Sequence, residues 1–243
     1  MTTALLYYTD SYRRSFDSLV TAVDREKHAV ALEATAFFPT GGGQPHDLGR
    51  LDWDGHVADV VQVSKDQNGV VWHTLDGDAA LPEIGASASG EIDWARRYLL
   101  MRIHSAQHVL NGVIWNEYGA HVTGASMTPG EGRLDFELPN MSQEFARSVE
   151  TAVNQQISRD LEVRVLFLPR AEADKDTSLM RLKANLIPRS VDPLRVIDIV
   201  GLDRQADGGT HVRSTSEIGR VRVIEAKSKG KANKRIRIAV EDA

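Results

Sequence analysis

The sequence predicts an α+β protein, in which a small N-terminal β-barrel precedes a mixed α/β domain built around one long helix. Three observations carry this prediction. Short β-favouring runs separated by turn residues fill the first part of the chain, helical spacing of apolar residues follows, and strands then alternate with one further helix. We place the boundary at residue 92, which gives a barrel domain over 1–92 and an α/β domain over 93–243.

The first domain is rich in β-branched and other apolar residues, interrupted by turn sequences such as 53–55 and 66–69. The predicted strands are Leu5–Tyr8, Ala29–Phe38, Gly49–Val63 and Val70–Leu75. After Leu75 the chain becomes small and polar, which is typical of a connection poor in strands or of one last short strand before the helix.

Three consecutive glycines in the segment 40–45 stand apart from the rest of this domain. Glycine lets the backbone adopt conformations closed to other residues and lets a ligand or another backbone approach closely. On the triplet alone, an ordinary β-turn is the favoured explanation. No Lys-Ser or Lys-Thr follows, and the glycines lack the spacing of a dinucleotide fold, so nucleotide binding has no support.

In the second domain, apolar residues recur at helical spacing from Trp94 to Tyr118 and predict one long amphipathic helix, opening at Asp93 as N-cap. Its predicted buried stripe is Leu99, Ile103, Ala106, Leu110, Val113 and Ile114. A second helix is expected from Ser142 to about Asp160, and short helix within 170–186. The expected strands are 121–127, 133–138, 161–168, 194–200, 221–226 and 235–240.

The long helix carries His104 and His108 four residues apart, so both imidazoles project from the same side and one divalent ion can bridge them. The pair alone is equally compatible with two core or surface histidines. No Glu follows the first His, so this is not the metalloprotease pattern.

A second pair of candidate ligands, Asp207 and His211, flanks a glycine-containing loop far along the chain. Together with His104 and His108 it supplies three histidines and one carboxylate, or three ligands and a water. Nitrogen and oxygen donors without thiolate fit zinc and also accept other divalent ions. The residues leave open whether Asp207 is a ligand.

The composition is that of a globular protein, with 42% hydrophobic and 26% charged residues, a net charge of −5 and no cysteine. The chain shows no secretory signal and no apolar run long enough to span a bilayer, so we expect a cytoplasmic enzyme or binding protein. The segment from Arg213 onward contains nine Lys or Arg and four acidic residues, so this tail is locally basic.

The segments HSAQHVLNG, RLDFEL and GGTHVRSTSEIG resemble the editing domain of alanyl-tRNA synthetases and its free-standing relatives, the AlaX-type alanyl-tRNA editing proteins. In addition, FFPTGGGQPHDLG resembles the glycine-rich segment of the longer AlaX forms, whose N-terminal barrel is similar to an elongation-factor domain. The resemblance covers nearly the whole chain.

This resemblance implies hydrolysis, at one zinc ion, of tRNA(Ala) mischarged with serine, chiefly, or with glycine. The family's HxxxH and CxxxH metal motifs fall on His104, His108 and His211, with Asp207 at the cysteine position. Loss of the thiolate changes metal preference and makes an inactive relative conceivable.

For recognition of the serine hydroxyl, which alanine lacks, we expect a short polar side chain near the metal. Thr123, which matches a threonine of the family, is the first candidate and Gln44 in the glycine loop the second. Gly42 and Gly43 are expected to contact the substrate, and the basic residues Lys229, Lys231, Lys234 and Arg235 to contact tRNA phosphates. A plain strand threonine and a solvated, lysine-rich strand edge are the ordinary explanations.

Two other functions remain open at this point. One is a metal-dependent hydrolase of another ester or amide that uses the same ligands. The other is a tRNA-binding protein whose metal site has decayed.

Overall fold

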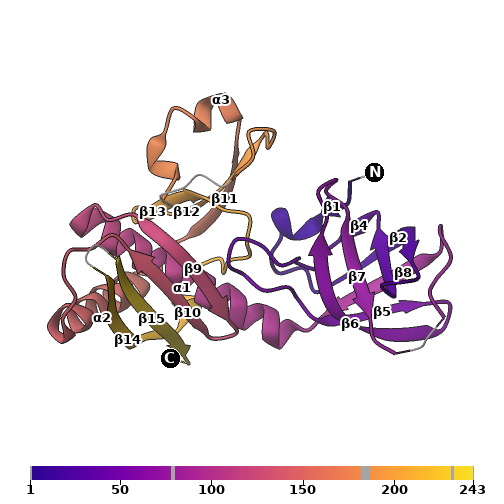
Figure 1. The fold of residues 1–243 in the computed structure, drawn as a ribbon, viewed down its shortest axis with the longest axis horizontal. Coiled ribbons are helices and arrows are strands. Elements are labelled where there is room, and N and C mark those ends of the chain that lie inside the picture. The colour runs from indigo at the N-terminus through magenta and orange to yellow at the C-terminus, as the bar shows by residue number, and fades with distance from the viewer. Residues whose placement is uncertain (1, 78–79, 182–186, 231–232, 243) are drawn as a thin grey trace. The chain divides into compact units, whose positions relative to one another are not determined.

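The structure is a computed structural model that describes residues 2–77, 80–181, 187–230 and 233–242 (Figure 1). The chain forms two compact units, Met1–Tyr98 and Leu99–Ala243, which divide within helix α1 (Trp94–Tyr118). The boundary expected at residue 92 lies just before this helix.

The first unit contains a closed barrel in which the strands follow the order β2-β3-β7-β6-β5-β8, all neighbours being antiparallel. The barrel strands are β2 (Ser15–Asp24), β3 (Ala29–Leu32), β5 (Gly49–Trp53), β6 (His56–Lys65), β7 (Val71–Leu75) and β8 (Ser87–Ile92). A short parallel pair, β1 (Ala4–Leu5) and β4 (Ala34–Thr35), and the 3₁₀ turn η1 (Leu6–Tyr8) complete the unit. The predicted N-terminal barrel is thus confirmed.

The barrel is filled by side chains from alternate positions of its strands, as the two-residue repeat of a strand requires. In β8, for example, exposed and buried residues alternate along the whole strand. Gly90 of β8 leaves room for the ring of Phe16, because a Cβ atom there would lie 2.4 Å from Phe16 Cε1. The interior is therefore a packed core.

A buried ion pair ties the first turn of α1 to the barrel unit. The Arg97 guanidinium binds both carboxylate oxygens of Asp47 and donates to the carbonyls of Ser11 and Ala36. Asp47 in turn accepts the backbone N–H of Phe38 at 2.6 Å. Because a buried charge without a partner is costly, these contacts fix the segment that carries the glycine triplet against α1's first turn.

The second unit contains two antiparallel sheets, with the strand orders β14-β15-β10-β9 and β11-β12-β13. Its strands are β9 (Val122–Thr128), β10 (Glu131–Phe136), β11 (Val163–Leu168), β12 (Leu194–Ile199), β13 (Asp203–Ala206), β14 (Arg220–Gly230) and β15 (Asn233–Glu241). Its further helical segments are α2 (Gln143–Ile157), α3 (Arg170–Ala173), η2 (Thr177–Leu179) and η3 (Thr215–Ile218). Ser142 caps α2 through the backbone N–H of Phe145, as predicted.

Helix α1 packs between these two sheets. On one side the Gln107 amide donates to carbonyls of β9 and β10, and Gly132 of β10 lies so close to this helix that a Cβ atom would meet Gln107 Nε2 at 2.9 Å. On the other side, Gly112 of α1 lies against Leu202 and Asp203, at the start of β13. The helix is therefore enclosed from opposite directions.

This enclosure corrects the prediction of an amphipathic helix with a single buried stripe. Every residue from Leu100 to Ile114 is buried, whereas Leu99, which was assigned to the stripe, is only half-buried. The polar side chains on the remaining faces are buried because they bind the neighbouring strands and loops. Composition alone cannot distinguish such residues from a solvent-facing side.

The observed strands differ from the predicted ones in four further places. Strands β2 and β13 were not predicted, and the expected strand Leu5–Tyr8 ends at Leu5, where η1 begins. The expected strand Ala29–Phe38 is interrupted at Glu33. The short helix predicted within 170–186 is present as α3 and η2, while residues 182–186 lie outside the described part of the chain.

Among the described residues, no helix is both long and apolar enough to cross a membrane.

Candidate metal centre

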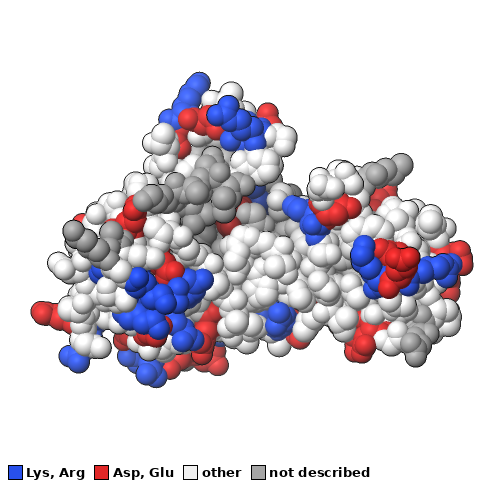
Figure 2. Space-filling view, in the orientation of Figure 1, with Lys and Arg blue, Asp and Glu red and all other residues white. Residues whose placement is uncertain are grey.

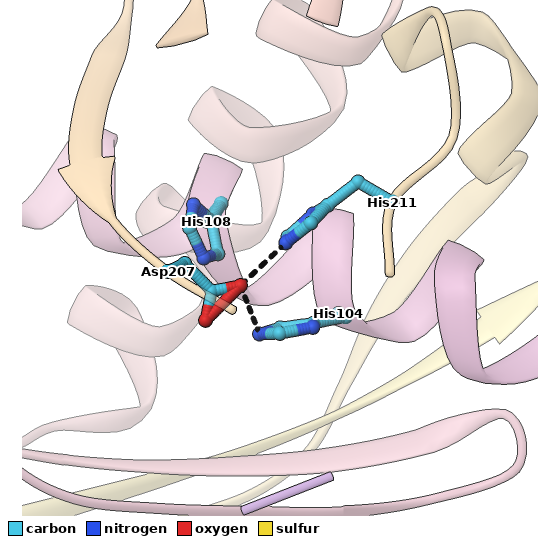
Figure 3. A group of neighbouring side chains, drawn as sticks. All are labelled: His104, His108, Asp207 and His211. Atoms are coloured by element: carbon cyan, nitrogen blue, oxygen red, sulfur yellow. Dashed lines mark hydrogen bonds and ion pairs between the residues drawn. The ribbon is translucent and has the colours of Figure 1, made fainter. Parts of the chain in front are cut away.

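Four side chains that are distant in sequence converge on one point of the second unit. His104 and His108 come from successive turns of α1, while Asp207 and His211 come from the loop that follows β13 (Figure 3). Their candidate ligand atoms all lie within 4.8 Å of one another. The structure thus brings together all four residues that the sequence singled out for a metal, and this group could hold a metal ion.

The separations within the cluster suit a shared ion. His211 Nε2 lies 2.9 Å from Asp207 Oδ1, and His104 Nε2 lies 3.6 Å from the same oxygen. The ring centroid of His211 is 4.2 Å from that of His104 and 4.5 Å from that of His108. The cluster is shielded from solvent, since the three histidines are 3–6% exposed.

Burial controls the charge of these groups. It lowers the pKa of His104 to about 4, and burial together with the neighbouring His104 and His108 lowers the pKa of His211 well below its usual range. For Asp207, burial alone would raise the pKa, but the interactions with His104 and His211 outweigh it and hold the pKa well below the usual range. Near neutral pH the cluster therefore offers imidazole lone pairs and an anionic carboxylate.

This donor set fits a divalent cation. Imidazole nitrogen and carboxylate oxygen are both ordinary zinc ligands, and four such donors converging on one point match a four-coordinate site. The sequence contains no cysteine, so thiolate takes no part.

Neighbouring groups hold the ligands in place. Ser105 Oγ lies 3.1 Å from His211 Nδ1 and accepts the backbone N–H of Val212 at 3.2 Å. These two contacts hold the loop that follows β13 against α1. The Asp207 carboxylate accepts the N–H of Gly209, and its main-chain carbonyl accepts a bond from Arg195 of β12. Such partners orient metal ligands.

Sequence reasoning missed Ser105, Asp203, Gln205 and Arg195. For Asp203 and Gln205 the sequence did contain a pattern that could have identified them. Asp203, Gln205 and Asp207 occupy alternate positions, and alternate residues of a strand share one face. Both Gln205 and Asp203 do contact α1 residues in the structure, through His108 Nδ1 at 3.0 and 3.5 Å.

The other candidate residues lie on different elements. Thr123 is exposed on β9, at the bulge between β9 and β10. Two acceptors share the single proton of its hydroxyl, Asp135 O at 3.2 Å and Asn233 Oδ1 at 3.3 Å. Gln44 is buried in the barrel unit, with its backbone paired to Gly41. Gly42 and Gly43 are exposed and have φ values of 59° and 88°, which only glycine adopts easily.

The basic residues of the tail differ in their surroundings. Lys229 is exposed, whereas the buried Lys234 ammonium donates to the Gly230 carbonyl, and Arg235 binds the Asp135 carboxylate through two nitrogens. Lys231 lies outside the described residues. Figure 2 shows Lys and Arg side chains gathered over β14 and β15, with acidic side chains beside them.

Comparison with known protein families links both parts of the chain to aminoacyl-tRNA synthetases. Residues 194–237 match the second additional domain of threonyl- and alanyl-tRNA synthetases. Residues 10–96 match the class II (A) tRNA synthetase family. The first match covers β12, β13 and the loop that carries Asp207 and His211.

Individual relatives match the chain along its whole length. The alanyl-tRNA editing protein AlaX-M of Saccharolobus solfataricus is 35% identical over 97% of this chain and 98% of its own. The AlaX-M protein of Methanosarcina acetivorans is 36% identical over 99% of this chain and all of its own. The alanine–tRNA ligase of Korarchaeum cryptofilum is 37% identical over 93% of this chain, which spans 25% of the ligase. With 35% and 36% identity to these two AlaX-M proteins over nearly its whole length, the chain belongs to the family of AlaX-M alanyl-tRNA editing proteins.

Proposed function

We propose that this protein is a trans-editing deacylase that hydrolyses the ester between a wrong amino acid, chiefly serine, and the 3′ end of tRNA(Ala). The reaction takes place at a zinc ion held by His104, His108, Asp207 and His211. The observation that carries the proposal is the convergence of three buried histidines and the half-buried Asp207 in a chain of the AlaX-M family.

The residues of the cluster have distinct parts in this proposal. Neutral imidazoles at His104 and His211 bind the ion without first losing a proton, and the Asp207 anion partly neutralises it. When bound, zinc supplies positive charge that stabilises the negative charge developing on the ester oxygens. Because the cluster is buried, that charge acts in a medium of low dielectric constant, where it has more effect.

The function is tested by comparing deacylation of Ser-tRNA(Ala), Gly-tRNA(Ala) and correctly charged Ala-tRNA(Ala). We expect rapid loss of serine, slower loss of glycine and little loss of alanine. If simple amino-acid esters are hydrolysed as fast as the same esters on tRNA, the protein is instead a general metal-dependent esterase. Tight tRNA binding without any hydrolysis would indicate a non-catalytic relative.

Selectivity is assigned to Thr123. A hydroxyl that hydrogen-bonds the serine side chain favours serine over alanine, because alanine leaves the polar group unpaired. The present partners of Thr123, Asp135 O and Asn233 Oδ1, accept at 3.2 and 3.3 Å, which are long for bonds donated by a hydroxyl. The Thr123 hydroxyl can therefore exchange them for a substrate.

Replacing Thr123 with valine keeps the shape of the side chain and removes the hydroxyl. We expect kcat/KM for Ser-tRNA(Ala) to fall by about tenfold to a hundredfold, since one hydrogen bond to a desolvated group contributes about 1–3 kcal/mol. Zinc content and melting temperature should be unchanged. Thr128→Val, at the exposed end of the same strand, is the matched control. Parental deacylation by Thr123→Val would assign recognition of serine to another residue.

In the barrel unit, Gln44 is the second polar group assigned to the substrate, and the exposed backbone of Gly42 and Gly43 is assigned to contacts with it. Glycines without side chains let a tRNA end approach the main chain closely. Nothing within 4 Å would meet a Cβ atom at Gly42, so any cost of a side chain there comes from its positive φ.

Contacts with tRNA phosphates are assigned to the exposed Lys229 of β14 and to Lys234 and Arg235 of β15. Lys231, which lies outside the described residues, is assigned to the same contacts. Replacing both Lys227 and Lys229 with glutamine should weaken tRNA binding and reduce the slope of log K against log salt by about one to two. The control is Lys27→Gln with Lys65→Gln, which changes the charge equally; Lys27 pairs with Asp24 as Lys227 pairs with Glu225. A salt slope equal to that of the parent would remove this surface from the tRNA footprint.

A further inference from the structure

Beside the candidate metal centre lies a buried carboxylate that the proposed reaction does not use. Asp203, the first residue of β13, has a side chain with 0% exposure. Its Oδ2 lies 3.5 Å from His108 Nδ1, and its Oδ1 lies 3.3 Å from Nε of the buried Arg181. Taking a carboxylate out of water is costly unless it is paired, so its location calls for a reason.

The contacts around Asp203 form a connected network. Gln205 Nε2 donates to Asp203 Oδ2 at 2.6 Å and lies 3.0 Å from His108 Nδ1. Asn111, one turn further along α1, donates to Gln205 Oε1 at 3.3 Å. His108 Nδ1 thus faces this network, through Gln205 Nε2 and Asp203 Oδ2.

The backbone is adapted to bring Asp203 to this position. A Cβ atom on Gly112 of α1 would lie 2.9 Å from Asp203 Cβ and 3.2 Å from the Leu202 carbonyl, so only glycine permits this approach. On its other side Asp203 is held by Arg181, whose guanidinium lies 4.2 Å from the ring centroid of Trp115. The carboxylate is therefore fixed relative to the helix that carries His108.

We propose that Asp203 is a positioning residue for His108. Its carboxylate accepts a hydrogen bond from the Nδ1–H of His108, which leaves the Nε2 lone pair directed at the metal. The inference rests on the metal site of the proposed function. A histidine that binds metal through one nitrogen carries its proton on the other, and a carboxylate there fixes both the tautomer and the orientation of the ring.

Metal binding then requires a rearrangement of hydrogen bonds at His108. In the present arrangement Gln205 Nε2 lies 3.0 Å from His108 Nδ1 and is nearer to it than the Asp203 carboxylate. With a metal on Nε2, the ring would carry its proton on Nδ1, where an amide nitrogen cannot accept it. The Gln205 amide gives way, and Asp203 Oδ2, now 3.5 Å away, becomes the acceptor.

The test uses the full chain loaded with zinc, and its readouts are zinc affinity, measured against a competing chelator, and the ¹⁵N and ¹H signals of the imidazoles. In the parent we expect His108 to be metallated at Nε2, with a slowly exchanging, strongly downfield proton on Nδ1. In Asp203→Asn we expect that proton signal to move upfield and zinc affinity to fall about 10- to 100-fold. Asp198→Asn, on the adjacent strand β12, is the control and should match the parent.

Two results would overturn the inference while the metal site itself stands. One is zinc bound to His108 through Nδ1 in the parent, and this result is available even if Asp203→Asn fails to fold. The other is parental zinc affinity with an unchanged Nδ1 proton signal in Asp203→Asn. A parent that binds no zinc would overturn the proposed function together with the inference.

Discussion

Replacing His211 with alanine is expected to abolish stoichiometric zinc binding and to lower deacylation of Ser-tRNA(Ala) by about a thousandfold or more. His211 is 3% exposed and lies close to all three other candidate ligands, so its loss opens the coordination shell from the loop side. A Lewis acid contributes several kcal/mol to stabilisation of the transition state, and about 4 kcal/mol corresponds to roughly a thousandfold in rate. The measurements are zinc content after dialysis and single-turnover deacylation.

The control for this variant is His56→Ala, which removes an exposed histidine of strand β6 in the barrel unit. It should retain zinc and activity. Circular dichroism has to show that His211→Ala is folded, since Ser105 loses a hydrogen-bond partner in the variant. A folded His211→Ala protein that keeps one zinc and the parental rate would contradict the assignment of His211 as a ligand.

Replacing Asp207 with alanine is expected to lower zinc affinity about 100-fold or more, and replacing it with cysteine to restore or tighten binding. A ligand should matter at least as much as the outer partners of a ligand, whose loss costs about 10- to 100-fold. Thiolate is a softer donor than carboxylate and favours zinc, so Asp207→Cys should also shift the preference toward zinc among divalent ions. Titration with limiting zinc, and with other divalent ions in competition, gives both quantities.

The structure also shows what Asp207 would do if it did not bind the metal. Its carboxylate also accepts the backbone N–H of Gly209 at 3.0 Å, so it could serve the loop alone and leave a site of three histidines and a water. In that case Asp207→Ala would bind zinc as the parent does, while His211→Ala would still lose it. Asp198→Ala supplies the control for removal of a carboxylate elsewhere in the same unit.

Much of the candidate site could be predicted from the sequence because its ligands follow local spacing rules. His104 and His108 share a helix face by their four-residue separation, and Asp207 and His211 flank glycines in a loop between strands. The position of the loop over the helix depends on tertiary contacts, such as the bond between Ser105 and the Val212 backbone. The sequence analysis joined the two pairs as one possible metal site and the resemblance to a known family supported this, but no spacing rule places the loop over the helix.

The parts that sequence reasoning missed share a physical cause. Strand β13 is short and polar, and its residues Asp203 and Gln205 lie against a buried helix, so its pattern resembles a solvent-facing turn. The helix itself was expected to expose its polar face, yet Asn111 and Gln107 are buried and bound to neighbouring strands. Polar residues inside a protein are satisfied by partners far along the chain, and local periodicity carries no information about such partners.

The most direct test of the account is the rate of Ser-tRNA(Ala) deacylation by metal-depleted protein as zinc is returned in known amounts. The account predicts a negligible rate without metal and a linear rise that ends at one zinc per chain. It also predicts that Ala-tRNA(Ala) is spared throughout the titration. Full activity in the metal-depleted protein, or zinc-dependent hydrolysis that does not distinguish serine from alanine, would contradict it.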